Sequence, residues 1–296
     1  MPITVPHLGA IEDISDLSWL RADPRFTPAG LLDRAPSVMP PREDIFRRLK
    51  DAQIDPRNAT STWIDDLVGA ILKTVEDTGA GDNTLVIFSS DHQSRGKDTC
   101  FASTHVPFVA RWPKGIPAGS KADALTANID LLPTFAELAG APITAPVDGR
   151  SFAAQLTGKP SPNPWPEHLL LECSNIRAVV TERWKYIANR PAAEVWKRIE
   201  DDALEAARTG RKRYVALDGV RNPHPGFAGE GIRYYALEDF PHYFDRDQLY
   251  DLRSDVFEQH NLAGDPSYHS ITNEMQDRLR SLLARLPHKF GEFTGK

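Results

Sequence analysis

A continuous apolar run from Thr84 to Ser90 is the feature that most constrains the fold of this chain. The run reads Thr-Leu-Val-Ile-Phe-Ser-Ser and shows no alternation of polar and apolar side chains. Such a run is typical of a strand that is buried on both faces, as in the parallel sheets of α/β proteins. We therefore predict that Thr84–Ser90 is a central strand of a mostly parallel sheet.

An amphipathic helix is expected directly before this strand. Ser61 or Thr62 is placed to cap its start, and Gly79 is placed to end it. Asp65 and Asp66 are expected on its solvated face. The apolar side chains recur at helical spacing and predict one buried stripe: Ile64, Leu67, Val68, Ile71, Leu72 and Val75.

Other segments complete the α/β half of the chain. A short helix is expected at Glu43–Asp51, and Val106–Trp112 reads as a strand in which Pro107 favours a strand start or an edge. Asp130 is placed to cap a further helix that Gly140 ends. This pattern predicts helices that flank the sheet.

The composition changes between Gly158 and Pro166, where Pro, Ser and Asn predominate. We predict a boundary here, with an α/β core in residues 1–160 and a smaller C-terminal part in residues 161–296. The second part is expected to hold an antiparallel sheet with two helices. Its predicted elements are strands at 168–173, 177–181, 184–188 and 248–252, and helices at 193–208 and 271–286.

Two polar side chains, Asp91 and His92, stand directly after the apolar run. Ligands of open α/β sheets bind outside the carboxyl ends of the strands. A carboxylate and an imidazole at that position can both reach one cation. From the residues alone, the pair is either half of a metal site or a hydrogen-bonded loop.

Several segments, taken in order, resemble the sulfatases of the alkaline phosphatase superfamily. The match runs from about Thr62 to Leu286, and this chain resembles the C-terminal half of such a protein. The resemblance implies part of an alkaline phosphatase-like, mostly parallel sheet flanked by helices, with a smaller antiparallel C-terminal α+β subdomain. The segments are Asp82–His92 with Gly96-Lys97, His105–Pro113, Asn128–Gly140, Asp148–Ser151, Arg177–Ile187, and Leu249–Leu252 with Glu258–Leu262.

The resemblance also implies roles for single residues. Asp91 and His92 would be ligands of a divalent cation, usually calcium. Lys97 would bind a sulfate oxygen and offset charge that develops in the reaction, although it also reads as a solvated loop lysine. His105 stands where the family often has Arg and is either a catalytic and substrate-binding residue or a structural one. The family's aromatic-Glu-Gly stretch is replaced by Phe101–Ser103.

The nucleophile motif of sulfatases does not occur in this sequence. The family makes a formylglycine within Cys/Ser-Xaa-Pro/Ala-Xaa-Arg, and Cys173–Arg177 keeps only the spacing from Cys to Arg. Formylglycine is therefore not encoded here. Three functions stay open: half of a sulfatase that another chain or a longer parent completes, a non-catalytic remnant that binds a glycan or a partner, and a phosphate or phosphonate ester hydrolase.

The charge and the start of the chain set expectations for partners and location. With 35 basic and 41 acidic residues the net charge is -6, so no nucleic acid partner is expected. We expect no membrane span and no signal peptide, hence a cytoplasmic chain as written, or a periplasmic or secreted one if the parent gene has an upstream signal. The expected partners are a sulfated small molecule or carbohydrate, and either a missing N-terminal half or a second copy.

Aromatic side chains crowd residues 227–244, where they either line a sugar-binding cleft or pack a loop. The two cysteines, Cys100 and Cys173, are too few for a disulfide framework; they either pair with each other or stay two separate thiols, and separate thiols are favoured.

Overall fold

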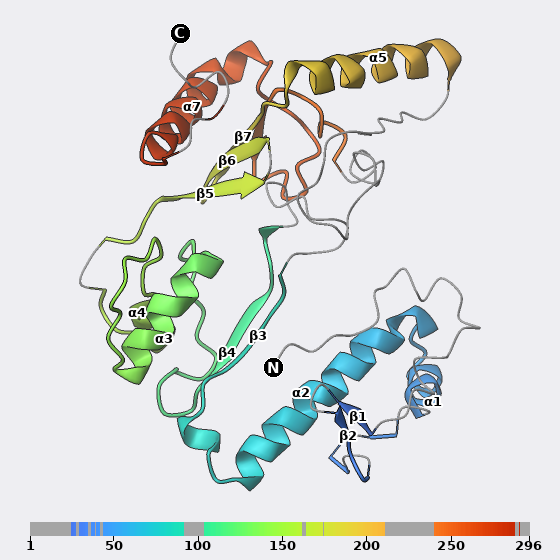
Figure 1. Cartoon of the computed structure of the whole chain (residues 1–296), viewed down its shortest axis with the longest axis vertical. Coiled ribbons are helices and arrows are strands. Elements are labelled where there is room, and N and C mark those ends of the chain that lie inside the picture. The colour runs from blue at the N-terminus through green and yellow to red at the C-terminus, as the bar shows by residue number, and fades with distance from the viewer. Residues whose placement is uncertain are drawn as a thin grey trace. The chain divides into compact units, whose positions relative to one another are not determined.

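The computed structural model describes residues 25–27, 30–34, 37–38, 40–41, 44–91, 104–161, 164–173, 175–210, 240–287 and 290 (Figure 1). The chain forms two compact units. One comprises Met1–Val86 and Arg111–Ala118, and the other comprises Ile87–Ala110 and Gly119–Lys296. The boundary expected between residues 160 and 161 rests on composition, and it stays a prediction.

The first unit is built on a helix pair. Helix α1 (Asp44–Asp51) packs on α2 (Ala59–Asp77) through Ile45, Leu49 and Ala59. Helix α2 begins before the expected caps at Ser61 and Thr62, because a 3₁₀ turn, η2 (Pro56–Asn58), leads into it. Its end follows the prediction, since Gly79 has φ 72° just beyond the last turn. The unit also holds η3 (Gly81–Asn83) and the antiparallel pair β1 (Phe26–Thr27) and β2 (Gly30–Leu31).

The prediction that Asp66 lies on a solvated helix face is wrong. Its carboxylate accepts two hydrogen bonds from the Arg48 guanidinium, at 2.8 and 2.5 Å, and its side chain is 8% exposed. These hydrogen bonds raise the pKa of Arg48 above its ordinary value. The ion pair therefore joins the two helices, a role that the helical period alone does not reveal.

Strand β3 (Val86–Ser89) pairs with β4 (Phe108–Arg111). The backbone N–H of Lys114, beyond β4, donates to the carbonyl of Asp82, before β3, at 3.2 Å. The end of β4 therefore lies beside the start of β3, so the two strands run in opposite directions. Within the residues described, β4 is the one strand paired with β3, and Phe88 stays partly exposed. The parallel neighbours expected for this strand are not among the described elements.

A buried polar network joins the three helical elements that follow β4 in the chain. These are η5 (Asn128–Asp130), α3 (Leu131–Ala139) and α4 (Ala153–Thr157). We predicted that the Asp130 side chain caps α3, but it makes no capping hydrogen bond to that helix. Its carboxylate instead accepts the backbone N–H groups of Ala127 and Arg150. Helix α3 ends at Gly140 with φ 65°, as predicted.

The C-terminal sheet confirms the predicted antiparallel arrangement. Its order is β5 (His168–Cys173), β6 (Ile176–Thr181), β7 (Trp184–Asn189) and β8 (Asp247–Asp251), and every neighbouring pair is antiparallel. The remaining elements are α5 (Ala193–Thr209), η7 (Pro266–Tyr268) and α7 (His269–Leu283).

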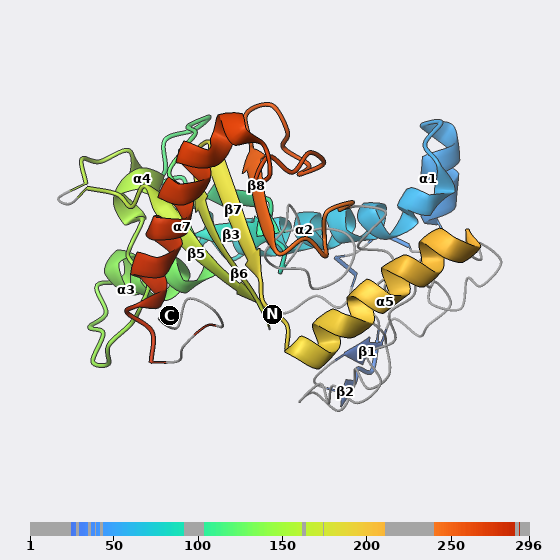
Figure 2. The same ribbon diagram turned by 90° about the horizontal axis from the view of Figure 1, so that it is seen from above.

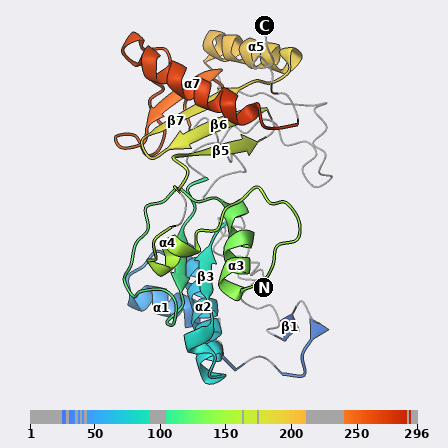
Figure 3. The same ribbon diagram turned by 90° about the vertical axis from the view of Figure 1, so that its left-hand side faces the viewer.

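The two faces of this sheet have different coverings. Helix α7 lies across one face (Figures 2 and 3), where Met275 and Leu279 pack on Tyr186 and Leu249. Because side chains alternate along a strand, Lys185, which precedes Tyr186 in β7, points to the other face. That face carries a second apolar cluster made of Ile176, Ala178, Ile187, Phe240 and Tyr250.

Part of the aromatic segment is described. Phe240 packs on the second face of the sheet, and Phe244 packs on Val195 and Ile199 of α5. These two rings therefore serve packing, and residues 211–239 lie outside the described part. In the portion of the chain that the structure describes, no helix is long and apolar enough to span a membrane.

Candidate functional site

A cavity of about 640 Å³ lies in the second unit and joins the β3–β4 pair to the C-terminal sheet. Asp91 follows β3, and Thr104 and His105 precede β4. Since the two strands run in opposite directions, these residues meet at one end of the pair and line the same cavity. The opposite wall comes from β5, β6 and β7 and includes Glu172 and Lys185.

The structure places two of the four predicted site residues on this cavity. Asp91 and His105 both line it. His92 and Lys97 lie outside the described residues, so their place relative to Asp91 stays a prediction. The signal for Asp91 was its position after an apolar strand, and the cavity at that strand end agrees with the expectation that ligands bind there.

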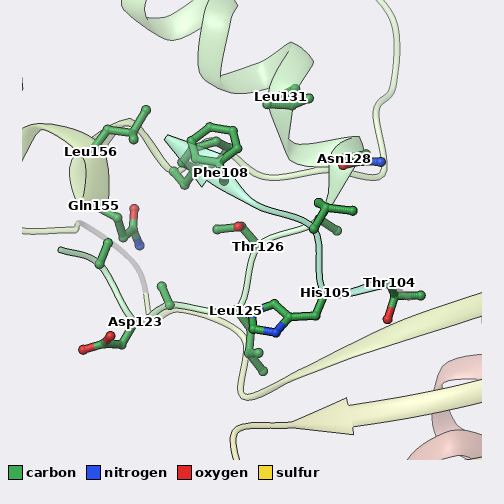
Figure 4. Close-up of a pocket in the computed structure, with 15 residues that line it drawn as sticks. Thr104, His105, Phe108, Asp123, Leu125, Thr126, Asn128, Leu131, Gln155 and Leu156 are labelled. Atoms are coloured by element: carbon green, nitrogen blue, oxygen red, sulfur yellow. The ribbon is translucent and has the colours of Figure 1, made fainter. Parts of the chain in front are cut away.

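A second cavity of about 470 Å³ shares part of this wall, including His105 and Asp123 (Figure 4). Gln155 of α4 and Phe108 of β4 complete its lining. Among the described residues, Gln155 Oε1 is buried and has no hydrogen-bond partner. The shared wall is tied to the C-terminal part, because Trp165 Nε1 donates to the Leu125 carbonyl at 2.6 Å. His105 thus stands between two cavities.

The sequence analysis did not find a buried ion pair on the cavity wall. Lys185 Nζ lies 2.7 Å from Glu258 Oε1, and the two side chains are 3% and 2% exposed. The sequence did carry one sign of this pair, a lysine within the otherwise apolar strand Trp184-Lys-Tyr-Ile-Ala188. Its side chain lies on the face of the sheet that α7 does not cover. Burial of such a charge is expensive unless it is paired, and Glu258 meets that condition.

Two family models and a curated relative match this chain. The family model described as Sulfatase matches residues 21–141, and the model described as N-sulphoglucosamine sulphohydrolase, C-terminal, matches residues 98–206. An ulvan-active sulfatase of Formosa agariphila is 36% identical over 214 residues, which are 69% of this chain and 38% of that protein. The chain belongs to the sulfatase family.

Solved structures give the same fold. A structure in complex with its substrate D-glucosamine-2-N,6-O-disulfate has TM-score 0.54 at 18% identity, over 76% of this chain and 39% of that one. A phosphonate monoester hydrolase from Silicibacter pomeroyi has TM-score 0.52 at 19% identity, over 97% of this chain and 51% of that one. The predicted mixed α/β fold is thereby confirmed, while parallel neighbours of β3 are not among the described elements. The chain spans between two fifths and about half the length of these relatives.

Sulfatases generally use a divalent cation, so the donor set around Asp91 can be tested against one. Calcium usually takes six to eight oxygen ligands. Within the described ranges, no group of three or more His, Cys, Asp or Glu side chains is arranged to hold a metal ion. The described residues therefore do not form a metal shell by themselves.

Proposed function

We propose that this chain is the substrate-binding part of a sulfatase that hydrolyses sulfate esters of carbohydrates. The observation that carries the proposal is the cavity beside the β3–β4 pair. Its wall holds Asp91 and His105, the two described residues to which the sulfatase resemblance gives a role in the site. A relative that is 36% identical is a sulfatase, and a solved neighbour binds a disulfated amino sugar.

The chemistry of the side chains supports distinct roles. The Asp91 carboxylate is a hard oxygen ligand of the kind that calcium prefers, and His92 would be its neighbour in the shell. Lys97 is proposed as the point charge that binds a sulfate oxygen. The His105 imidazole, on the cavity wall, would donate a hydrogen bond to the sulfate or to the sugar. The cation, when bound, would polarise the sulfate ester.

We expect no hydrolysis by this chain alone, because the sequence holds no formylglycine motif. The test is to purify the chain, add calcium, and follow release of sulfate from an aryl sulfate and from several sulfated sugars. Calcium-dependent binding without turnover supports the proposal. Turnover that disappears in Asp91→Ala would show that a nucleophile exists in this chain, and absence of any binding would overturn the proposal.

Phosphonate ester hydrolysis is the second candidate, because the phosphonate monoester hydrolase fold covers 97% of this chain. That likeness, at 19% identity, concerns the fold alone. The same binding assay separates the two functions, since a sulfatase should prefer a sulfate monoester to a methylphosphonate ester of the same alcohol. The reverse preference would favour the phosphonate hydrolase.

A further inference from the structure

One wall of the 640 Å³ cavity is formed by the face of the C-terminal sheet that α7 does not cover. Leu169 of β5 is the cross-strand partner of Val180 of β6, and Val180 is also the partner of Lys185 in β7. Residues directly opposite one another on neighbouring strands lie on the same face of a sheet. All three line the cavity, so this row of the sheet presents two apolar side chains to it.

The neighbouring row of the same face is covered by other side chains. Leu171, Ala178 and Ile187 are partners across β5, β6 and β7, and they pack in the apolar cluster that contains Phe240. Within the described part of the chain, Leu169 and Val180 belong to neither apolar cluster of this sheet. The apolar surface of the sheet therefore continues beyond its covered part and into the cavity.

The polar side chains of this wall have partners within the protein. Lys185 and Glu258 pair with each other and are almost wholly inaccessible to solvent, so they add no polar surface to the cavity. The Thr181 hydroxyl donates to a backbone carbonyl at 3.1 Å. Glu172 and Glu182 each form an ion pair with an arginine, at 2.7 and 2.5 Å. The surface that this wall offers to a ligand is therefore mainly aliphatic.

Two further aliphatic side chains extend this surface. Leu252 and Val256 line the same cavity, and Val256 is 51% exposed. A ligand that covers such side chains removes apolar surface from water, which is favourable and requires no fixed direction of contact. Among the described residues no aromatic side chain lines this cavity, so the stacking contacts that an aromatic ligand prefers are not offered. The wall fits an aliphatic chain.

The polar end of the cavity fits a different part of the ligand. Asp91 and His105 line the cavity where β3 ends and β4 begins. Cavities of about 300–1,000 Å³ hold drug-sized ligands, so a volume of about 640 Å³ leaves room for a chain beside a sulfated sugar. One ligand with a charged end and an apolar end can therefore be in contact with both parts.

We propose that the aliphatic wall binds an alkyl or acyl chain carried by the sugar whose sulfate ester is held at Asp91 and His105. This inference rests on the proposed function, and it names the class of sugar sulfate that the chain recognises. The residues that would contact the aliphatic chain are Leu169, Val180, Leu252 and Val256.

The experiment is calorimetric titration of the chain in calcium with methyl, butyl and hexyl glucoside 6-sulfate. Burial of one methylene group raises affinity by about threefold to fourfold, so affinity should increase by about tenfold or more from methyl to hexyl. The heat-capacity change of binding should also become more negative along the series, because it reports burial of apolar surface.

A double variant tests whether the wall is responsible. Val180→Thr/Val256→Thr keeps the branched shape of both side chains and adds a hydroxyl to each, so the ratio of hexyl to methyl affinity should fall by about threefold or more. Val109→Thr is the matched control. Val109 is an exposed valine of β4 that does not line this cavity, and its replacement should leave the ratio unchanged.

Two further ligands test the same contact on the unaltered chain, including the case in which the double variant does not fold. A diethylene glycol chain of similar length in place of hexyl should bind no more tightly than methyl, because it carries less apolar surface. Hexyl glucoside without the sulfate should bind more weakly than its 6-sulfate. Equal binding of these last two would separate the wall from the sulfate site and overturn the inference.

The other outcomes are also distinct. Equal affinity for the methyl and hexyl sulfates overturns the inference, and the proposed function stands. Tighter binding of phenyl than of hexyl glucoside 6-sulfate would assign the wall to an aromatic group and overturn the inference as well. If no sugar sulfate binds, the proposed function fails and the inference fails with it. A gain with chain length that the double variant loses supports the inference.

Discussion

At the scale of single residues, the turn Asp148–Ser151, one of the segments that resemble sulfatases, has a physical explanation. A Cβ on Gly149 would lie 1.9 Å from the carbonyl oxygen of Ile129, so only glycine fits there. Arg150 then donates its backbone N–H to the buried carboxylate of Asp130. The sequence analysis found this motif by resemblance, but the contact with Asp130 joins residues 20 apart, which no local pattern reveals.

Thr134→Val tests this network. The buried Thr134 hydroxyl donates to the Asp130 carbonyl at 2.6 Å and accepts the Phe152 N–H at 3.0 Å. Valine leaves that N–H buried without a partner, so we expect a loss of about 1–3 kcal/mol in the free energy of unfolding, measured by urea denaturation. Thr157→Val is the control, because the Thr157 hydroxyl only bonds back to the Ala153 carbonyl. Equal losses in the two variants would contradict the explanation.

Arg48→Met tests the ion pair between α1 and α2. It leaves the Asp66 carboxylate largely buried without its partner, and we expect a loss of about 3 kcal/mol in chemical denaturation. Arg47→Met, one residue away, removes an arginine whose side chain is 61% exposed. It should cost less than about 0.5 kcal/mol. Similar values for the two variants would show that the pair does not stabilise the helices.

At the scale of secondary-structure elements, periodicity predicted most of the helices and the C-terminal strands. Helix α5, strand β5 and the closing strand β8 lie within one or two residues of their predicted bounds. The partner of β3 was not predicted, since an apolar run reports burial and says nothing about which strand pairs with it. The start of α2 was missed for a similar reason, because a 3₁₀ turn without a side-chain cap leaves no motif.

Strand β5 gives a pH dependence with a definite sign. Burial, followed by the charges of Arg278 and Arg285, lowers the pKa of His168 below 6.5. As the pH falls through 6.5, the unfolded chain takes up a proton that the folded chain does not, so stability present above this pH is lost below it. His168→Gln should lose less stability than the original chain between about pH 7.5 and 5. Parallel curves from thermal denaturation would contradict this assignment.

At the scale of the whole molecule, apolar side chains are exposed on elements around the site. Val109 of β4 is 63% exposed and Leu132 of α3 is 60% exposed. Exposed apolar surface and open strand edges favour association. We predict concentration-dependent self-association in light scattering after size exclusion, and a shift toward monomer in Val109→Lys/Leu132→Lys. Val256→Lys, at another exposed apolar position, should not dissociate the species. A monomer at every concentration would contradict the prediction.

The site as a whole was only partly accessible to sequence reasoning. Asp91 and His105 were found because motif order placed them, and both line the cavity. Lys185 and Glu258 were missed, since their pairing joins positions 73 apart and depends on the register of β7 with β8. The residues that the family motifs mark are thus accessible to sequence reasoning, whereas the opposite wall of the cavity depends on tertiary structure.

Methyl NMR of the chain with calcium and a sulfated monosaccharide tests the central claim most directly, because it locates the ligand. The account predicts that the resonances of Leu125, Leu169 and Val256, which line the cavity, shift on titration. Those of Met275 and Leu279, which belong to α7 and are buried against the opposite face of the sheet, should not move. Loss of these shifts in Asp91→Ala would tie binding to the proposed site. Shifts confined to residues away from the cavity, or no shifts at millimolar ligand, would contradict the account.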